Sequence, residues 1–116
     1  MAATVLIVDD HPPWRALARE VLEAEGYTVV GESVDGRSAL AAARLLGRGL
    51  VLLDVHLPDV DGRDLVPSFG GALVVLVSGR ERSSFGRGLL DSGAVGFLAK
   101  DELSGATFRA LVGEAG

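Results

Sequence analysis

The chain has 116 residues, of which 48% are hydrophobic, and this combination predicts one folded domain over residues 1–116 and excludes a disordered chain. The formal net charge of −5 argues against a general nucleic-acid surface, and the lack of cysteine excludes disulfides, thiolate metal sites and cysteine nucleophiles. No apolar run approaches the ~18 residues of a membrane span, and the first residues carry no basic region of a signal peptide, so we expect no membrane partner and a cytoplasmic location.

Short apolar runs rich in β-branched residues alternate along the chain with segments of helical spacing. The runs cover residues 4–8, 28–32, 50–53, 73–78 and 95–98. The helical segments cover residues 13–25, 37–46, 63–69, 82–91 and 103–112. Strands that are apolar throughout and alternate with helices are typical of a parallel sheet covered on both faces. We therefore predict a doubly wound, five-stranded α/β domain.

Capping chemistry marks the starts of the first two helices. Asp10 or His11 is expected to cap the first helix, because the prolines that follow suit its opening turn. Asp35 is expected to open the second helix.

The third and fourth helices are expected to be the weakest. Pro67 falls inside the third, which should span only one or two turns. The fourth contains Gly86 and Gly88, each of which costs about 1 kcal/mol relative to alanine in a helix interior, so this helix should be marginal.

Carboxylates follow two of the predicted strands. Asp9 and Asp10 come directly after the first apolar run, and Asp54 follows the third. Ligands of open parallel sheets bind outside the carboxyl ends of the strands, so these acids can converge on one cation. Clustered carboxylates repel one another, and Mg²⁺ suits one or two of them, with a backbone carbonyl such as that of His56 completing the protein ligands.

Two more polar residues end later strands. Ser78 follows the fourth run, and Lys100, the only lysine among 11 cationic residues, follows the fifth. Each polar residue alone also has an ordinary interpretation as a cap, a turn residue or a solvated side chain. Together, the acids, the hydroxyl and the ammonium fit an aspartate that accepts a phosphoryl group.

These residues form motifs that resemble the receiver domain of bacterial two-component response regulators over nearly the whole chain. In chain order the motifs are Asp9-Asp10, Asp54-x-x-Leu57-Pro58-x-x-Asp61-Gly62, Ser78 and Gly93-Ala94-x-Gly96-Phe97-Leu98-x-Lys100. The resemblance implies a flavodoxin-like (βα)5 fold and a role in signal transduction through a phosphorelay.

The resemblance also implies roles for individual residues. Asp54 would accept the phosphoryl group from a sensor histidine kinase, and the protein would otherwise show only slow loss of that group rather than enzyme turnover. Asp9 and Asp10 would hold Mg²⁺ together with Asp54. Ser78 and Lys100 would contact the phosphoryl oxygens.

Further implied roles concern switching and the lifetime of the phosphorylated form. Ser78 and Phe97 would be the switch residues, and they would rearrange the face formed by the fourth helix, fifth strand and fifth helix. His56 and Arg80 occupy positions that tune dephosphorylation in this family, and their bulk would shield the acyl phosphate.

The segment over residues 93–101 is most similar to the NarL/LuxR-type subfamily of transcription regulators, in which an aspartate, here Asp101, often follows the lysine. Such regulators contact DNA through a C-terminal effector domain, and we expect no such domain within these 116 residues. The chain is either a single-domain regulator or an excised receiver, and a homodimer is a further possibility.

Two other functions compete with this interpretation. A haloacid-dehalogenase-like phosphatase also uses a strand-end aspartate with Mg²⁺, but its two acids are separated by one residue, whereas Asp9 and Asp10 are adjacent. A pseudo-receiver, which binds partners without being phosphorylated, remains an alternative because the stretch between Asp54 and Ser78 is short.

Trp14 is interpreted as a packing residue of the first helix, with kinase docking as the alternative.

Overall fold

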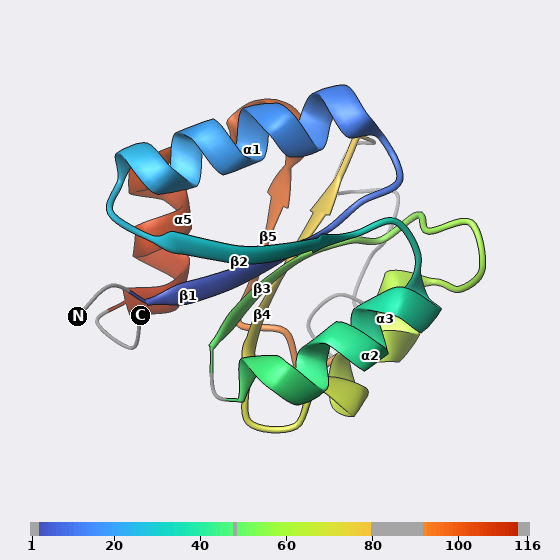
Figure 1. Ribbon diagram of the computed structural model, residues 1–116. Coiled ribbons are helices and arrows are strands. Elements are labelled where there is room, and N and C mark those ends of the chain that lie inside the picture. The colour runs from blue at the N-terminus through green and yellow to red at the C-terminus, as the bar shows by residue number, and fades with distance from the viewer. Residues whose placement is uncertain (1–2, 48, 80–91, 114–116) are drawn as a thin grey trace.

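The computed structural model describes residues 3–47, 49–79 and 92–113 (Figure 1). Its five strands form one parallel sheet in the order β2-β1-β3-β4-β5. The strands are β1 Thr4–Val8, β2 Thr28–Ser33, β3 Leu50–Asp54, β4 Leu73–Ser78 and β5 Gly96–Ala99. All five predicted strands are therefore confirmed to within one residue at each end, and the strand order is that of a flavodoxin-like sheet.

Helices cover both faces of this sheet (Figure 1). The described helices are α1 Pro12–Ala24, α2 Gly36–Leu46, α3 Gly62–Leu65 and α5 Gly105–Val112, with 3-10 helices at Val66–Phe69 and Lys100–Glu102. The predicted fourth helix over residues 82–91, with Gly86 and Gly88, lies outside the described residues. Among the helices that are described, none is long and apolar enough to cross a bilayer.

Alternate strand residues build two separate apolar cores, one on each face of the sheet. In β1, Val5 and Ile7 point to the core shared with α1 and α5, whereas Leu6 and Val8 point to the core shared with α2 and α3. The residues of β3 divide in the same way, and every one of them is buried. The two central strands are thus covered on both sides, which fixes their carboxyl ends in space.

Helix α1 starts within one residue of the predicted position, with the prolines in its opening turn, but the predicted side-chain cap is absent. His11 occupies the N-cap position, but neither its side chain nor that of Asp10 caps the helix. Pro12 and Pro13 fill the first two helical positions and so remove two N–H groups that a cap could bind, and the Asp9 carboxylate accepts the N–H of His11 itself. The acid pair is thereby left available for other contacts.

The second helix begins as predicted and has an additional cap. The Asp35 carboxylate accepts the N–H of Ser38 at 2.9 Å. The Asp59 carboxylate, from the loop after β3, accepts the N–H groups of Gly36 at 2.8 Å and Arg37 at 3.1 Å. This second cap ties the loop that follows Asp54 to the start of α2.

The remaining helix boundaries follow local chemistry. The third helical segment is short as predicted, with four α-helical residues followed by a 3-10 helix of four that contains Pro67. The last helix begins at Gly105 rather than at residue 103, because the Ser104 hydroxyl accepts the N–H of Thr107 and caps it there.

Candidate phosphoryl-acceptor site

The carboxyl ends of β1, β3, β4 and β5 meet at one edge of the sheet. Val8 pairs with Leu53, so the acids that follow β1 lie beside Asp54 at the end of β3. Asp54 pairs with Val77 and Ser78 pairs with Ala99, which brings the ends of β4 and β5 to the same edge. In this order β2 lies on one side of β1 and the later strands lie on the other, so the strand order switches between β1 and β3, the place where open α/β sheets bind ligands.

Asp54 is the central carboxylate of this edge and is 2% exposed. Its Oδ1 accepts the N–H of His56 at 3.0 Å, and its Oδ2 lies 3.5 Å from Lys100 Nζ. Burial raises the pKa of Asp54 from 3.8 to about 6. The neighbouring Asp9 carboxylate adds to this rise, while the His56 N–H and the Lys100 ammonium oppose it.

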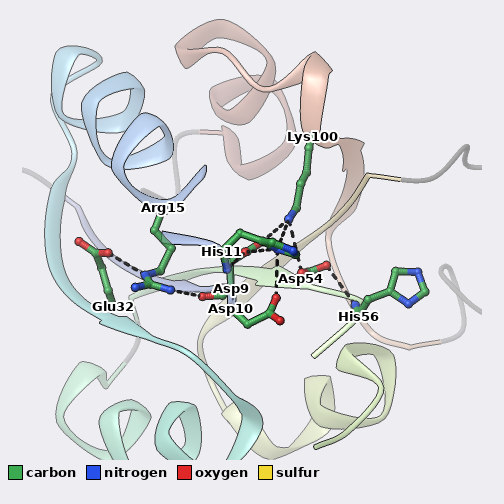
Figure 2. A network of polar contacts seen from close by, with 8 residues as sticks. All are labelled: Asp9, Asp10, His11, Arg15, Glu32, Asp54, His56 and Lys100. Atoms are coloured by element: carbon green, nitrogen blue, oxygen red, sulfur yellow. Dashed lines mark hydrogen bonds and ion pairs between the residues drawn. The ribbon is translucent and has the colours of Figure 1, made fainter. Parts of the chain in front are cut away.

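Asp9 is fully buried and is held on both oxygens (Figure 2). Oδ1 accepts the N–H of His11 at 2.7 Å, and Oδ2 forms an ion pair with Lys100 Nζ at 2.5 Å. The Asp9 carbonyl accepts a hydrogen bond from Arg15 Nη1 at 2.6 Å, and Arg15 Nε is in turn bonded to Glu32 on β2 at 3.0 Å. Contacts from three elements therefore fix the position of this acid.

Lys100 lies at the end of β5 and bridges the two buried acids through its ammonium group. The same nitrogen lies 4.9 Å from the ring centroid of Trp14, a cation–π distance. Trp14 also packs against the core under α1, as predicted. A compact ammonium that touches both carboxylates is suited to pair with a third anionic group placed between them.

His11 belongs to this cluster, and sequence reasoning considered it only as a helix cap. Its ring Nδ1 lies 3.1 Å from Asp9 Oδ1 and 3.1 Å from Asp10 Oδ1, and 3.5 Å from Lys100 Nζ (Figure 2). The available signal was its position directly after the acid pair.

Four residues at this edge offer ligand atoms that lie within 4.8 Å of one another: Asp9, Asp10, His11 and Asp54. Within the described part of the chain, Asp10 Oδ1 is buried without a hydrogen-bond partner. Three carboxylates face one lysine here, so the site has excess negative charge and an unsatisfied oxygen. These properties fit a hard divalent cation such as Mg²⁺, which prefers carboxylate oxygens.

The loop after β3 supports Asp54 through a close backbone approach. Asp61 caps α3 by accepting the N–H of Arg63 at 2.9 Å, and it pairs with the Arg63 guanidinium at 2.6 Å. Gly62 lies against Asp54, because a Cβ at Gly62 would stand 2.2 Å from the Asp54 carbonyl oxygen. The glycine in the predicted motif is therefore required by packing beside the acceptor.

The other predicted site residues lie where the motifs place them. Ser78 is fully buried at the end of β4, and Phe97 is half-buried in β5 against the core shared with α2 and α3. The His56 side chain is exposed, and His56 forms an isolated bridge with Asp61. Arg80 lies outside the described residues. The switch, metal-carbonyl and dephosphorylation roles of these residues remain predictions.

Comparison with known proteins shows which family shares this sequence. A sequence model of the response regulator receiver domain matches residues 5–111. The Bordetella pertussis virulence factors putative positive transcription regulator BvgA is 43% identical over 102 residues, which cover 84% of this chain and 49% of BvgA. The nitrate/nitrite response regulator protein NarP of Escherichia coli is 36% identical over 102 residues, which cover 84% of this chain and 47% of NarP.

A solved structure agrees with these sequence matches. The signal receiver domain of the putative response regulator NarL from Mycobacterium tuberculosis superimposes with a TM-score of 0.84 at 30% identity, covering 97% of this chain and 98% of that domain. The chain spans about half the length of the curated relatives it matches.

Proposed function

The chain belongs to the response regulator receiver family of two-component systems, and from this premise we propose that it accepts a phosphoryl group on Asp54 in a Mg²⁺-dependent reaction. The observation that carries the proposal is the placement of Asp54, which is buried at a strand end with Lys100 Nζ 3.5 Å from its Oδ2. Asp9 is the other buried carboxylate of the described residues that contacts the lysine, but Lys100 Nζ lies closer to it, at 2.5 Å, and Asp54 is the one that stands in the acceptor motif.

In the proposed reaction an Asp54 oxygen attacks the phosphorus of a phosphohistidine on a sensor histidine kinase. A new O–P bond forms as the N–P bond breaks, and the electron pair returns to the donor imidazole, which takes up a proton. A small acyl phosphate can serve as donor in the same way. The product is an aspartyl phosphate on this chain and an unmodified histidine on the kinase.

The residues around Asp54 would stabilise the transferred group electrostatically. Lys100, which now bridges Asp9 and Asp54, would pair with a phosphoryl oxygen, and the Ser78 hydroxyl would donate to another. Asp9, Asp10 and Asp54 would hold Mg²⁺ with the His56 carbonyl. When bound, this cation would neutralise the acids and the phosphoryl oxygens as charge is transferred.

The output of the domain would be a rearranged surface. Once Ser78 turns toward the phosphoryl group, Phe97 would move into the space it leaves, and the face that includes β5 and α5 would change. An effector domain or partner would read that face, and DNA contact would come only through such an effector, as the transcription-regulator relatives suggest. Two receivers could also associate through this face.

The acceptor role is tested by intact mass after incubation with acetyl phosphate and Mg²⁺. We expect a gain of one phosphate in the unaltered chain, and no gain in Asp54→Asn or when EDTA replaces Mg²⁺. Asp64→Asn is the matched control, because Asp64 is an exposed acid outside the cluster. Phosphate on Asp54→Asn would contradict the proposal, and no phosphate on any variant would favour a pseudo-receiver. Sustained turnover of phosphoesters would favour the phosphatase.

The switching role is tested separately by amide hydrogen exchange. A phosphoryl mimic such as beryllofluoride with Mg²⁺ should change exchange within residues 80–97. Unchanged exchange there, with the mimic bound, would contradict the switch role of Ser78 and Phe97.

A further inference from the structure

The acid cluster contains an imidazole that the proposed reaction does not use. His11 Nδ1 lies 3.1 Å from an oxygen of Asp9 and 3.1 Å from an oxygen of Asp10. Figure 2 shows the ring lying among the carboxylates and Lys100 rather than pointing away from them. His11 therefore adds a nitrogen donor to a site otherwise made of oxygens.

We propose that His11 Nδ1 is a ligand of the metal site and gives this receiver a preference for transition cations such as Co²⁺ and Ni²⁺ over Mg²⁺. The proposal rests on the metal role of the acids in the proposed function. Carboxylate oxygens alone suit Mg²⁺, whereas an imidazole nitrogen favours the divalent transition metals in the order Mn²⁺, Fe²⁺, Co²⁺, Ni²⁺. Mixed imidazole and carboxylate donors thus bind these cations more tightly without a comparable gain for Mg²⁺.

The distances in the cluster agree with this role. Two ligands at right angles around an ion with bonds of about 2.1 Å lie about 3 Å apart. The two separations of 3.1 Å from His11 Nδ1 match that spacing. One of the oxygens concerned, Asp10 Oδ1, is buried and accepts no hydrogen bond from the described residues. The nitrogen and the two oxygens therefore need little rearrangement to face one ion.

The backbone around His11 holds the ring near the acids. The His11 N–H donates to Asp9 Oδ1 at 2.7 Å, and Pro12, with its restricted φ, follows directly. The ring is not needed to neutralise Asp9, because Lys100 Nζ already contacts that carboxylate at 2.5 Å. The His11 side chain is also 65% exposed, so it can turn its ring nitrogen toward a cation without breaking core packing.

The experiment is calorimetric titration of the whole chain, without a histidine tag, with MgCl2, CoCl2 and NiCl2. The variants are His11→Ala, His11→Gln, which keeps a hydrogen-bonding group but no imidazole, and the control Asp64→Asn, which alters an exposed acid outside the cluster. We expect both His11 variants to weaken Co²⁺ and Ni²⁺ binding at least about tenfold and Mg²⁺ binding less than about threefold. Circular dichroism checks that each variant is folded.

A spectroscopic readout identifies the ligand independently of affinity. The visible absorption bands of bound Co²⁺ should shift in both His11 variants and not in Asp64→Asn, because only the His11 variants lose a nitrogen ligand. An equal loss for all three cations, no loss at all, or the same shift in Asp64→Asn would overturn the assignment of His11. Failure of Mg²⁺ itself to bind the unaltered chain would instead contradict the metal role of the acids, and this inference with it.

Discussion

The ionisable residues of this site are placed by strand ends, and most of them could be identified from the sequence for that reason. Asp9, Asp54 and Lys100 each follow an apolar strand, and the register of parallel strands then brings them to one edge. His11 was not predicted as part of the site, because its place depends on the direction of its side chain in the turn between β1 and α1. Sequence patterns predict positions along strands well and side-chain directions in turns poorly.

At the scale of one residue, the pKa of Asp54 predicts a pH-dependent effect of its removal. A folded pKa of about 6 against an ordinary value of 3.8 means that ionised Asp54 costs the metal-free fold about 3 kcal/mol. This cost is absent below about pH 4, grows as the pH rises through 6, and is complete above it. The pKa of about 6 already includes the opposing attraction of Lys100.

Asp54→Asn should therefore raise the free energy of unfolding in EDTA by roughly 1–3 kcal/mol at pH 8 and by little at pH 4. Urea unfolding at the two pH values measures this difference. Asp64→Asn, an exposed acid, is the control and should show no such pH dependence. A variant less stable than the unaltered chain at pH 8 would contradict the unfavourable burial of Asp54.

Trp14 provides a second prediction at this scale. It is the only tryptophan, and its ring lies 4.9 Å from Lys100 Nζ. A divalent cation that binds the acids competes with Lys100 for them, so the ammonium should shift relative to the ring. We expect a saturable change in Trp14 emission on adding Mg²⁺ and no change in Asp10→Ala. NaCl at equal ionic strength is the control, and an equal change with NaCl would contradict this explanation.

At the scale of elements, the β3–α3 loop, which was predicted only as a turn, also holds the start of α2 and the backbone of Asp54 in place. Its Asp59 caps α2, and its Gly62 packs against the backbone of Asp54. The sequence predicted a short third helix from Pro67 and two helix starts, one at Asp35 and one at the prolines. The structure confirms all three, but neither Asp10 nor His11 caps α1. The Asp59 cap was not predictable, because it joins elements 22 or more residues apart in sequence.

Gly62→Ala should displace the Asp54 backbone and destabilise the fold. The added Cβ would stand 2.2 Å from the Asp54 carbonyl oxygen, which is too close for any rotation to relieve. We expect a loss of at least about 2 kcal/mol in unfolding free energy and slower phosphorylation by acetyl phosphate. Gly79→Ala is the matched control for stability, because nothing lies within 4 Å of its added Cβ. Equal stability of the two variants would contradict the packing requirement.

At the scale of the whole molecule, the fold was predictable because apolar strand runs and segments of helical spacing alternate regularly along the chain. Apolar strands alternating with helical segments leave a doubly wound sheet as the arrangement that covers both faces, and the order β2-β1-β3-β4-β5 is observed. The structure of residues 80–91 is not described, so the predicted weakness of the fourth helix is untested. The predicted start of α5 at residue 103 was wrong because Ser104 caps the helix, which therefore begins at Gly105.

Mg²⁺ binding should stabilise the whole domain, because it relieves the repulsion of the acids only in the folded state. At ten times Kd the linkage relation gives about 1.4 kcal/mol, or a rise in Tm of roughly 5 °C for a domain of this size. Thermal unfolding with MgCl2 measures the rise, and NaCl at equal ionic strength controls for screening. An equal rise in Asp10→Asn would show that Mg²⁺ acts elsewhere.

The strand order also divides the site into a rigid part and an adjustable part. β1 and β3 lie inside the sheet with a neighbour on each side, whereas β5, which ends beside Lys100, is an outer strand that pairs only with β4 among the described strands. Separating Asp9 from Asp54 would break the hydrogen bonds of two interior strands, but moving the lysine disturbs only one edge. Evolution of a new output in such a domain can therefore proceed by altering β5 and the C-terminal helix, while the chemistry of the acids stays intact.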